Sequence, residues 1–209
     1  ELGLLAPDVF IPIAERSGLI LPIGDWVLDR ACAQLRAWHD AGHADWSMAV
    51  NLSPLQFASP ALLDSVREVL QRHRIEPARL TLEITETTAM KDVDASLAIL
   101  NDLTAMGVHI AIDDFGTGYS SLLYLKRMPA TELKIDRAFV RDLECNDEDA
   151  AIVSSIIALG RTLQLQVVAE GVETQAQREY LSELGCDQLQ GYHLGRPMEA
   201  EEFLRRVAG

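Results

Sequence analysis

The chain has 209 residues, and its 32 acidic side chains against 18 lysines and arginines give a formal net charge of −14 at pH 7. This length suits one domain with a sizeable core or part of a larger barrel, and the charge argues against binding a long nucleic acid, which requires many phosphates to be neutralised by Lys and Arg. No apolar run reaches the roughly 18 residues of a membrane span and no signal-peptide pattern is visible, so we expect a cytoplasmic segment without membrane contact.

The predicted secondary structure is a regular alternation of helices and strands. A short helix and a loop occupy residues 7–23, Gly24 closes the loop, and an amphipathic helix runs from Asp25 to about Ala41. Six strands follow, at 47–53, 80–85, 108–113, 132–136, 165–170 and 187–192. Each is followed by a helix, at 60–74, 92–106, 120–127, 148–163, 174–184 and 199–207. This alternation is the signature of a parallel α/β fold.

The parallel strands can form either an open sheet or a closed barrel. No GxGxxG turn and no GKT turn follows any strand, which weakens the case for an open nucleotide-binding sheet. We therefore expect a (β/α)8 barrel of the TIM type, which needs about two more strands than the chain supplies. The chain begins at Glu1 without a methionine, so we place the missing strands upstream of it.

The strand at 108–113 runs directly into two aspartates and a glycine-rich loop. Asp113 and Asp114 lie at the end of the strand, and Gly116 and Gly118 follow within the loop. Adjacent carboxylates at a strand end suit a divalent cation. Taken alone, however, the pair has a second interpretation, because Asp114 could instead cap the helix expected near Ser120.

Polar side chains recur at the ends of the other strands. Because side chains alternate between the two faces of a strand, the apolar set packs against helices and the other set points toward the barrel axis. Near the strand ends, this polar set and the adjacent Asp114 give Asn51, Glu83, Asp113, Asp114, Lys134, Glu170 and Gln190. These residues are expected at the carboxyl-terminal mouth of the barrel, where such barrels carry their active sites.

Several carboxylates with one lysine in a confined mouth would repel one another unless cations were bound. Their all-oxygen ligands favour Mg²⁺ or Mn²⁺ over zinc, and the adjacent Asp113 and Asp114 could bridge two ions. The three cysteines, Cys32, Cys145 and Cys186, show no paired spacing and are expected as reduced thiols. A site for hard cations is therefore the prediction, although Asn51 and Gln190 could instead be hydrogen-bonding spacers.

Two further glutamates have alternative interpretations. Glu86 could accept hydrogen bonds from backbone N–H groups of the glycine-rich loop, or it could open a helix in the TETTAM segment. Glu173 could contact a substrate, or it could precede the helix that begins near Thr174. The sequence pattern does not decide between these alternatives.

The segments that carry these residues resemble the EAL-type cyclic di-GMP phosphodiesterases. The matching segments are FIPIAERSGLI, NLSPLQF, LTLEITE, IAIDDFGTGYSSL, LKIDRAFV, VVAEGVET and QGYHLGRPM, and they cover the chain almost end to end. The combination of DDFGTGYSSL with AEGVET is highly specific. The resemblance implies one domain over residues 1–209 with a modified eight-stranded barrel, and metal-dependent hydrolysis of cyclic di-GMP to linear pGpG.

The resemblance also implies roles for individual residues. The expected ligands of two Mg²⁺ or Mn²⁺ ions are Asn51, Glu83, Asp113, Asp114 and Glu170, with Asp113 shared by both ions. Lys134 would contact the attacking water and, with Glu170, form the catalytic pair. Glu86 would anchor the loop at 115–122. We expect the substrate-binding residues to be Gln190, Glu173 and Asp136.

One part of the family pattern is missing from the chain. The Glu-Ala-Leu strand, whose glutamate is a metal ligand and whose following arginine touches phosphate, would normally precede the first residues by a few positions. Either it lies upstream of Glu1, as we expect, or the protein is a fragment with an incomplete site. The family pattern also allows sensory or cyclase-like domains upstream.

Two other functions compete with hydrolysis. A degenerate relative could bind cyclic di-GMP as a receptor without cleaving it, although such relatives usually lose ligands that this chain retains. A metal-dependent lyase or epimerase could use Lys134 on a carboxylic acid, but it would not account for the loop sequence. A homodimer is also expected, with helix 120–127 and segment 138–150 as candidate contacts.

Overall fold

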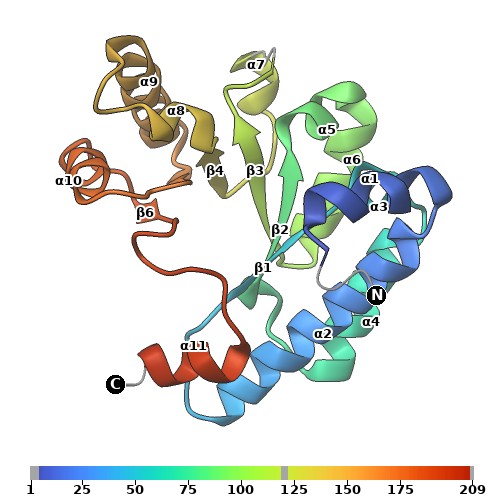
Figure 1. The fold of residues 1–209 in the computed structure, drawn as a ribbon. Helices are drawn as coiled ribbons and strands as arrows, with labels where there is room; N and C mark the ends of the chain where they lie inside the picture. Colours follow the sequence, from blue (N-terminus) through green and yellow to red (C-terminus); the bar gives the residue numbers. More distant parts are fainter. Residues whose placement is uncertain (1–4, 119–121, 208–209) are drawn as a thin grey trace. The chain divides into compact units, whose positions relative to one another are not determined.

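Strands and helices alternate along residues 5–118 and 122–207, the part of the chain that the computed structural model describes (Figure 1). Every strand pairing that the structure gives for these residues is parallel and joins two strands consecutive in the chain. The predicted α/β class with parallel strands is therefore confirmed. The chain divides into a first unit, residues 1–84 and 88–110, and a second unit, residues 85–87 and 111–209.

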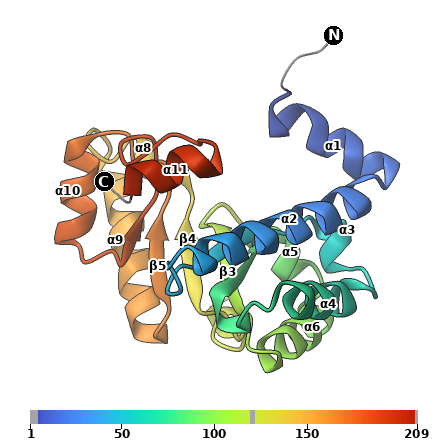
Figure 2. The same ribbon diagram turned by 90° about the horizontal axis from the view of Figure 1, so that it is seen from below.

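The first unit is built on the parallel pair of β1 and β2. Its elements are α1 (Pro7–Ser17), α2 (Ile20–Asp40), β1 (Met48–Asn51), α3 (Pro54–Phe57), α4 (Leu62–His73), the 3-10 helix η1 (Pro77–Arg79), β2 (Leu80–Thr85) and α6 (Val93–Ala105). Its fully buried side chains include Leu35, Leu80, Leu82, Leu100 and Leu103. Helices α4 and α6 contact each other and run beside one another in Figure 2. The short helix α5 (Glu86–Lys91) follows β2 directly.

The second unit contains the other four strands and the helices that connect them. Its elements are β3 (His109–Phe115), α7 (Leu122–Leu125), β4 (Glu132–Ile135), α8 (Arg137–Arg141), α9 (Asp147–Leu163), β5 (Gln166–Ala169), α10 (Gln175–Glu183), β6 (Gln188–Leu189) and α11 (Ala200–Val207). Strand β4 pairs with β3 on one side and with β5 on the other, and β5 pairs in turn with β6. Helix α9 packs against β4 and β5. The carboxyl ends of these strands carry most of the predicted site residues.

The largest difference from the sequence-based elements is at Gly24. Helix α2 begins at Ile20 and includes Gly24, so the predicted loop closed by this glycine is wrong. The side chain of Gln56 occupies the space beside Gly24, and a Cβ atom on Gly24 would lie 1.8 Å from Gln56 Nε2. The glycine therefore permits a close approach within a helix instead of ending a loop.

The smaller differences from the predicted elements involve helices and strands that are too short to show a periodic pattern of apolar residues in the sequence. Helices α3, α5 and α8 have four to six residues each; α3 and α8 were not predicted, and a helix at α5 was only one of the two interpretations of Glu86. Strand β3 continues through Phe115, and β6 is reduced to Gln188–Leu189. Residues 120 and 121 of the predicted helix 120–127 lie outside the described residues, and α7 covers Leu122–Leu125. Among the described helices, none is long and apolar enough to cross a bilayer.

Candidate functional site

Three carboxylates converge in the second unit. One oxygen from each of Asp113, Asp114 and Glu170 lies within 4.8 Å of the others. Asp113 and Asp114 belong to β3, and Glu170 directly follows β5, which places all three at the carboxyl ends of parallel strands. The structure thus brings together three of the five predicted metal ligands.

A backbone irregularity allows two adjacent aspartates to share this cluster. In a regular strand Asp113 and Asp114 would point to opposite faces. The β3–β4 register shifts between Ile112 and Phe115, and Asp114 adopts a left-handed conformation with φ of 54°. Aspartate tolerates this conformation better than most residues, and its N–H donates a 3.0 Å hydrogen bond to Oδ1 of Asp113. The bulge therefore re-aims a side chain toward the site, as bulges beside active sites often do.

The ammonium of Lys134 lies among these carboxylates. Its Nζ is 2.7 Å from Glu170 Oε1 and 3.3 Å from Asp113 Oδ1, and only 4% of the lysine side chain is exposed. Lys134 belongs to β4, so this contact joins the ends of three neighbouring strands. A buried ion pair with low exposure is screened little by solvent, so the lysine holds the two carboxylates at fixed positions.

Negative charge accumulates in the cluster despite the lysine. Burial, then the hydrogen bond shared with Asp136, then the charges of Asp113, Asp136 and Glu170 raise the pKa of Asp114 to about 6. Each of these causes disfavours the ionised carboxylate. A bound cation would act in the opposite direction, because a positive charge within a few ångströms favours ionisation.

The donor set fits the hard divalent cation that the family resemblance implies. All of its atoms are carboxylate oxygens, which suit Mg²⁺ or Mn²⁺ better than softer metals. In the described residues no cysteine or histidine belongs to the cluster. Asp113, Asp114 and Glu170 could therefore hold a cation, and Lys134 lies where it can contact a group bound beside it.

The loop after β3 is braced by Glu86. The carboxylate oxygen Oε2 of Glu86 accepts a 2.8 Å hydrogen bond from the N–H of Gly116, and Glu86 is 1% exposed. Glu86 is also the first residue of α5, so both interpretations of this residue are correct. A Cβ on Gly118 would lie 2.7 Å from Glu86 Oε1, which shows how closely the loop packs on the carboxylate. Residues 119–121 of the predicted loop lie outside the described part of the chain.

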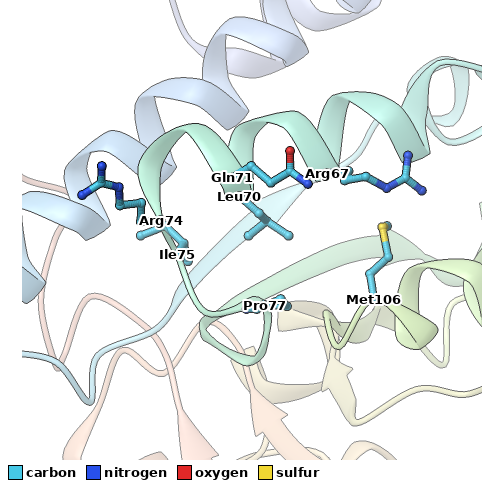
Figure 3. Close-up of a pocket in the computed structure, with 7 residues that line it drawn as sticks. All are labelled: Arg67, Leu70, Gln71, Arg74, Ile75, Pro77 and Met106. Atoms are coloured by element: carbon cyan, nitrogen blue, oxygen red, sulfur yellow. The ribbon is translucent and has the colours of Figure 1, made fainter.

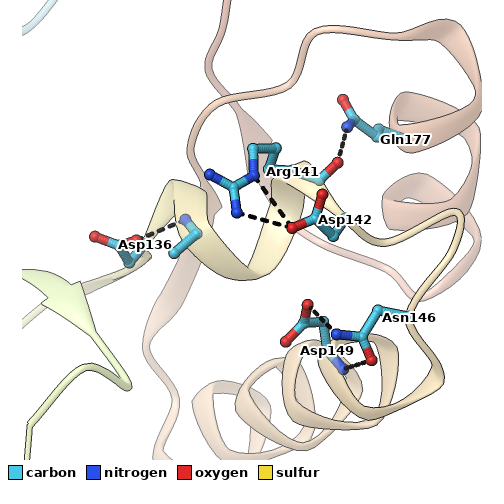
Figure 4. A network of polar contacts seen from close by, with 7 residues as sticks. Asp136, Arg141, Asp142, Asn146, Asp149 and Gln177 are labelled. Atoms are coloured by element: carbon cyan, nitrogen blue, oxygen red, sulfur yellow. Dashed lines mark hydrogen bonds and ion pairs between the residues drawn. The ribbon is translucent and has the colours of Figure 1, made fainter.

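Asp136 lies between the cluster and α8. Its Oδ1 accepts a 2.6 Å hydrogen bond from the N–H of Ala138 and caps the helix (Figure 4). At the other end of α8, the carbonyl of Arg141 accepts a 3.1 Å hydrogen bond from Gln177 Nε2. Helix α8 is thus held at both ends, and its N-terminus is fixed beside Asp114.

Gln177 also holds the segment that contains Glu173. Its Oε1 accepts hydrogen bonds of 2.7 Å from the N–H of Glu173 and 3.0 Å from the N–H of Thr174. Gln177 is 3% exposed, whereas the side chain of Glu173 is exposed. The backbone of Glu173 is therefore fixed three residues after Glu170, while its carboxylate faces solvent.

Gln190 is held through its backbone. Its N–H donates a 2.8 Å hydrogen bond to the carbonyl of Ala169, and its own carbonyl accepts a 3.0 Å bond from the N–H of Val172. A Cβ on the next residue, Gly191, would lie 2.2 Å from the Val172 carbonyl oxygen. The exposed Gln190 side chain is therefore placed beside the segment that follows Glu170.

The two remaining predicted ligands lie in the first unit. Asn51 ends β1 and is directly opposite Glu83 in the parallel register of β1 and β2. Glu83 is 7% exposed, and its carbonyl accepts a 2.9 Å hydrogen bond from the N–H of Leu52. The structure therefore places these two residues beside each other at neighbouring strand ends.

Two buried glutamines that hold the site segments were missed in the sequence. Gln56 and Gln177 are each the fourth residue of a capping box, with Ser53 and Thr174 as the respective N-caps. The pattern Ser/Thr-x-x-Gln was readable in both places and predicts a helix N-terminus. What the pattern could not predict is the second partner of Gln177, the carbonyl of Arg141.

Comparison with known sequences gives one family. The EAL domain pattern matches residues 1–197. The chain is 65% identical over 206 residues to the bifunctional diguanylate cyclase/cyclic di-GMP phosphodiesterase MucR of Pseudomonas aeruginosa, covering 99% of this chain and 30% of that protein. It is 45% identical to the cyclic di-GMP phosphodiesterase NbdA of the same species, covering 97% of this chain and 26% of that protein.

Comparison with solved structures gives the same relative, MucR. A structure described as the PaMucR phosphodiesterase in complex with c-di-GMP matches with a TM-score of 0.96 at 65% identity, over 98% of this chain and 83% of that chain. This likeness supports the barrel-type α/β architecture that the sequence predicted. The chain nevertheless spans less than a third of the length of MucR and NbdA.

Proposed function

This chain belongs to the EAL domain family, and on that premise we propose that it hydrolyses cyclic di-GMP to linear pGpG in a metal-dependent reaction. The observation that carries the proposal is the cluster of Asp113, Asp114 and Glu170 around the buried ammonium of Lys134. The similarity to MucR and NbdA, both cyclic di-GMP phosphodiesterases, supports the same substrate, and cyclic di-GMP chemistry would place the domain in the cytoplasm.

The carboxylates of Asp113, Asp114 and Glu170 would hold the metal. We further propose Asn51 and Glu83 as ligands, two Mg²⁺ or Mn²⁺ ions per site, and Asp113 as the residue shared by both ions, on the strength of the family resemblance. Bound divalent cations lower the pKa of water and stabilise negative charge that develops on phosphate oxygens.

Lys134 and Glu170 would act on the reacting groups. The Lys134 ammonium, fixed by Asp113 and Glu170, would donate a hydrogen bond to the attacking water and offset charge that develops on the phosphoryl group. Fixing this donor before the reaction matters, because a preorganised dipole or charge costs no reorganisation in the transition state. Substrate contacts would come from Gln190, Glu173 and Asp136, and Glu86 would keep the β3 loop in place.

Hydrolysis by the intact protein tests the proposal. With Mg²⁺ or Mn²⁺, chromatography should show conversion of cyclic di-GMP to pGpG, and Asp113→Asn should reduce turnover at least a hundredfold, since oriented charge at a reaction centre contributes about 10²–10³ in rate. Asp40→Asn is the matched control, because the side chain of Asp40 is 69% exposed and pairs with Arg36 in α2, outside the cluster. Absence of pGpG, or equal turnover in Asp113→Asn and in the unmodified protein, would reject the assignment.

A receptor that binds cyclic di-GMP without cleaving it is the second candidate. The observation that favours it is the direct contact of Lys134 with Asp113 and Glu170, which offsets part of their charge without any metal. Equilibrium dialysis distinguishes the two functions. A receptor retains intact cyclic di-GMP in the presence of Mg²⁺, whereas the enzyme releases pGpG.

We also propose a homodimer that uses α7 and segment 138–150. Leu122 and Leu123 of α7 are 59% and 65% exposed, which is unusual for two consecutive leucines at a helix start. Sedimentation equilibrium should show a concentration-dependent dimer, and Leu123→Glu should shift it toward monomer. A monomer at all concentrations would reject this interface. The name of MucR further supports an upstream cyclase-like domain in the parent protein.

A further inference from the structure

The first unit contains a pocket that none of the predicted site residues lines. It has a volume of about 450 Å³, within the range of roughly 300–1,000 Å³ that is typical of small-molecule sites. One wall is a stripe of α4 made of Arg67, Leu70 and Gln71, and Arg74, the residue directly after the helix, continues it (Figure 3). The spacing of three and four residues from Arg67 places Leu70 and Gln71 on the same helix face.

The interior of the pocket is apolar. Leu70 and Ile75 are buried at its base, and Pro77 and Met106 close it on the side away from α4 (Figure 3). The turn after Met106 packs on Pro77, since a Cβ on Gly107 would lie 3.3 Å from Pro77 Cβ. A methionine at this wall adapts to ligands of different shape, because its side chain is unbranched and polarisable.

The rim of the pocket is cationic, although the chain as a whole carries a net charge of −14. The guanidinium of Arg67 pairs with Asp64 at 2.5 Å. For Arg74, by contrast, the structure gives no acidic partner among the described residues. A guanidinium without a carboxylate partner at the edge of an apolar pocket complements an anionic head group on an apolar body.

The backbone of Arg74 has a conformation that glycine usually adopts. Arg74 follows the last residue of α4 in a left-handed conformation, with φ of 52° and ψ of 46°. Glycine is the residue that most often takes this position, since it adopts positive φ without steric cost. An arginine there is held in a sparsely populated conformation at the mouth of the pocket.

We propose that this pocket binds a small amphiphilic carboxylate, with an aliphatic body against Leu70, Ile75 and Met106 and the carboxylate on the guanidinium of Arg74. A planar guanidinium matches a carboxylate in bidentate geometry. A more highly charged phosphate fits less well, because Asp64 pairs with the lining residue Arg67, and Glu76 lies in the chain between the lining residues Ile75 and Pro77, so both would repel it more strongly. The site is independent of the proposed hydrolysis.

Titration with sodium octanoate tests the site in the intact chain. The methyl carbon signal of Met106, one of five methionines, should shift saturably below the micelle concentration, with a Kd of about 1 mM or tighter. Octyltrimethylammonium has the same apolar body and the opposite charge, and should leave the signal in place. Equal shifts with both probes, or no shift with octanoate, would overturn the proposal.

Arg74→Gly separates binding from folding. The variant should weaken octanoate binding at least tenfold, because a charge-assisted hydrogen bond is lost. It should not lower the unfolding midpoint, because glycine suits the backbone at this position. Gln164→Gly is the matched control, since Gln164 caps α9 with φ of 60° and lies outside the pocket, so octanoate binding should persist.

Two results would contradict the role of Arg74. One is unchanged octanoate affinity in Arg74→Gly. The other is a Met106 shift that depends on protein concentration and not on octanoate, since it would mean that a second copy of the chain occupies the pocket.

Discussion

The turn after β1 and the loop after β3 are each held in place by a buried side chain, but the two side chains are of different kinds. We call residues 52–57 the β1 turn and residues 116–118 the β3 loop. Each follows a strand that carries proposed ligands at or near its carboxyl end, Asn51 in β1 and Asp113 and Asp114 in β3. Each is also braced by a buried side chain that accepts a hydrogen bond from a backbone N–H: Gln56 Oε1 accepts from Ser53, and Glu86 Oε2 accepts from Gly116.

The two braces differ in charge and in distance along the chain. Gln56 is neutral and lies three residues from its partner, whereas Glu86 is a carboxylate thirty residues from Gly116. Each also needs a glycine beside it, Gly24 for Gln56 and Gly118 for Glu86. A local neutral brace costs little to form, whereas a buried charged brace makes stronger hydrogen bonds but leaves a larger penalty when one partner is removed. We therefore expect the β3 loop to be the more sensitive of the two.

The largest effect is expected for Glu86→Leu. It leaves the Gly116 N–H without its acceptor and should lower the free energy of unfolding by about 1.5–3 kcal/mol, the range for a hydrogen bond to a charged group. Because Asp113 and Asp114 precede this loop, cyclic di-GMP turnover should fall at least tenfold. Urea unfolding and a hydrolysis assay measure both changes. A loss of stability with unchanged turnover would show that the brace does not position the aspartates.

Gly24→Ala tests the neutral brace. The added Cβ would collide with Gln56, and overpacking of about 1–3 kcal/mol should exceed the roughly 1 kcal/mol that alanine gains over glycine in a helix. We expect a net loss of about 1 kcal/mol in urea unfolding. Combining Gly24→Ala with Gln56→Ala should recover part of this loss, because the collision disappears. Additive losses in the double variant would contradict the close approach.

Gly118→Ala should have a smaller effect on stability and a visible effect on the site. Its Cβ would lie 2.7 Å from Glu86 Oε1, a milder overlap than the 1.8 Å between a Cβ on Gly24 and Gln56 Nε2, so a smaller shift of the side-chain end relieves it. We expect a loss below about 1 kcal/mol, with a weaker bond from Gly116 to Glu86. Hydrogen exchange of the Gly116 amide should therefore accelerate. Unchanged exchange would mean that the loop accommodates the methyl group without shifting.

The smallest effect concerns the support of α2, the helix that contains Gly24. Hydrogen bonds from His73 at 2.9 Å and Arg72 at 2.7 Å hold the pKa of Asp29 below its usual value and connect α2 to α4. A lowered pKa in the folded state means that the stabilisation is present above the unfolded pKa and is lost as the pH falls through the folded pKa. Because the pair is partly exposed, we expect no more than about 0.5 kcal/mol.

Unfolding of Asp29→Asn measures this contribution. The variant should be slightly less stable than the unmodified protein near neutral pH, and the difference should vanish as the pH falls below the folded-state pKa of Asp29. A difference that grows with acidity would have the wrong sign for a carboxylate with a lowered pKa.

Much of the fold and part of the site could be predicted because their signals are local. Strand β2 was predicted with its observed bounds, since apolar residues alternate cleanly from Leu80 to Thr85. The positions of Asp113, Lys134 and Glu170 at strand ends followed from the same alternation. Their convergence could be inferred because parallel strands end on one side of a sheet.

Other features required contacts between distant residues. The role of Gly24 depends on Gln56, which is thirty-two positions later, and the sequence suggested only a loop. The double role of Glu86 depends on the conformation of Gly116, and the pocket beside α4 depends on where Met106 lies relative to Pro77. The periodicity of apolar residues within one segment does not indicate how close that segment lies to residues elsewhere in the chain.

The sequence by itself determined the order and parallel direction of the elements, the hard-cation chemistry of the strand ends and the resemblance to one family. It did so because burial, alternation and ligand type are properties of neighbouring residues. The sequence predicted both Asp113 and Asp114 at the strand end, but only the tertiary structure decided how adjacent residues can share one cluster, because the left-handed backbone at Asp114 reverses the alternation that a regular strand imposes. Only the tertiary structure likewise shows that buried side chains from elsewhere in the chain hold the site segments, because a hydrogen bond depends on distance in space and not on separation along the sequence.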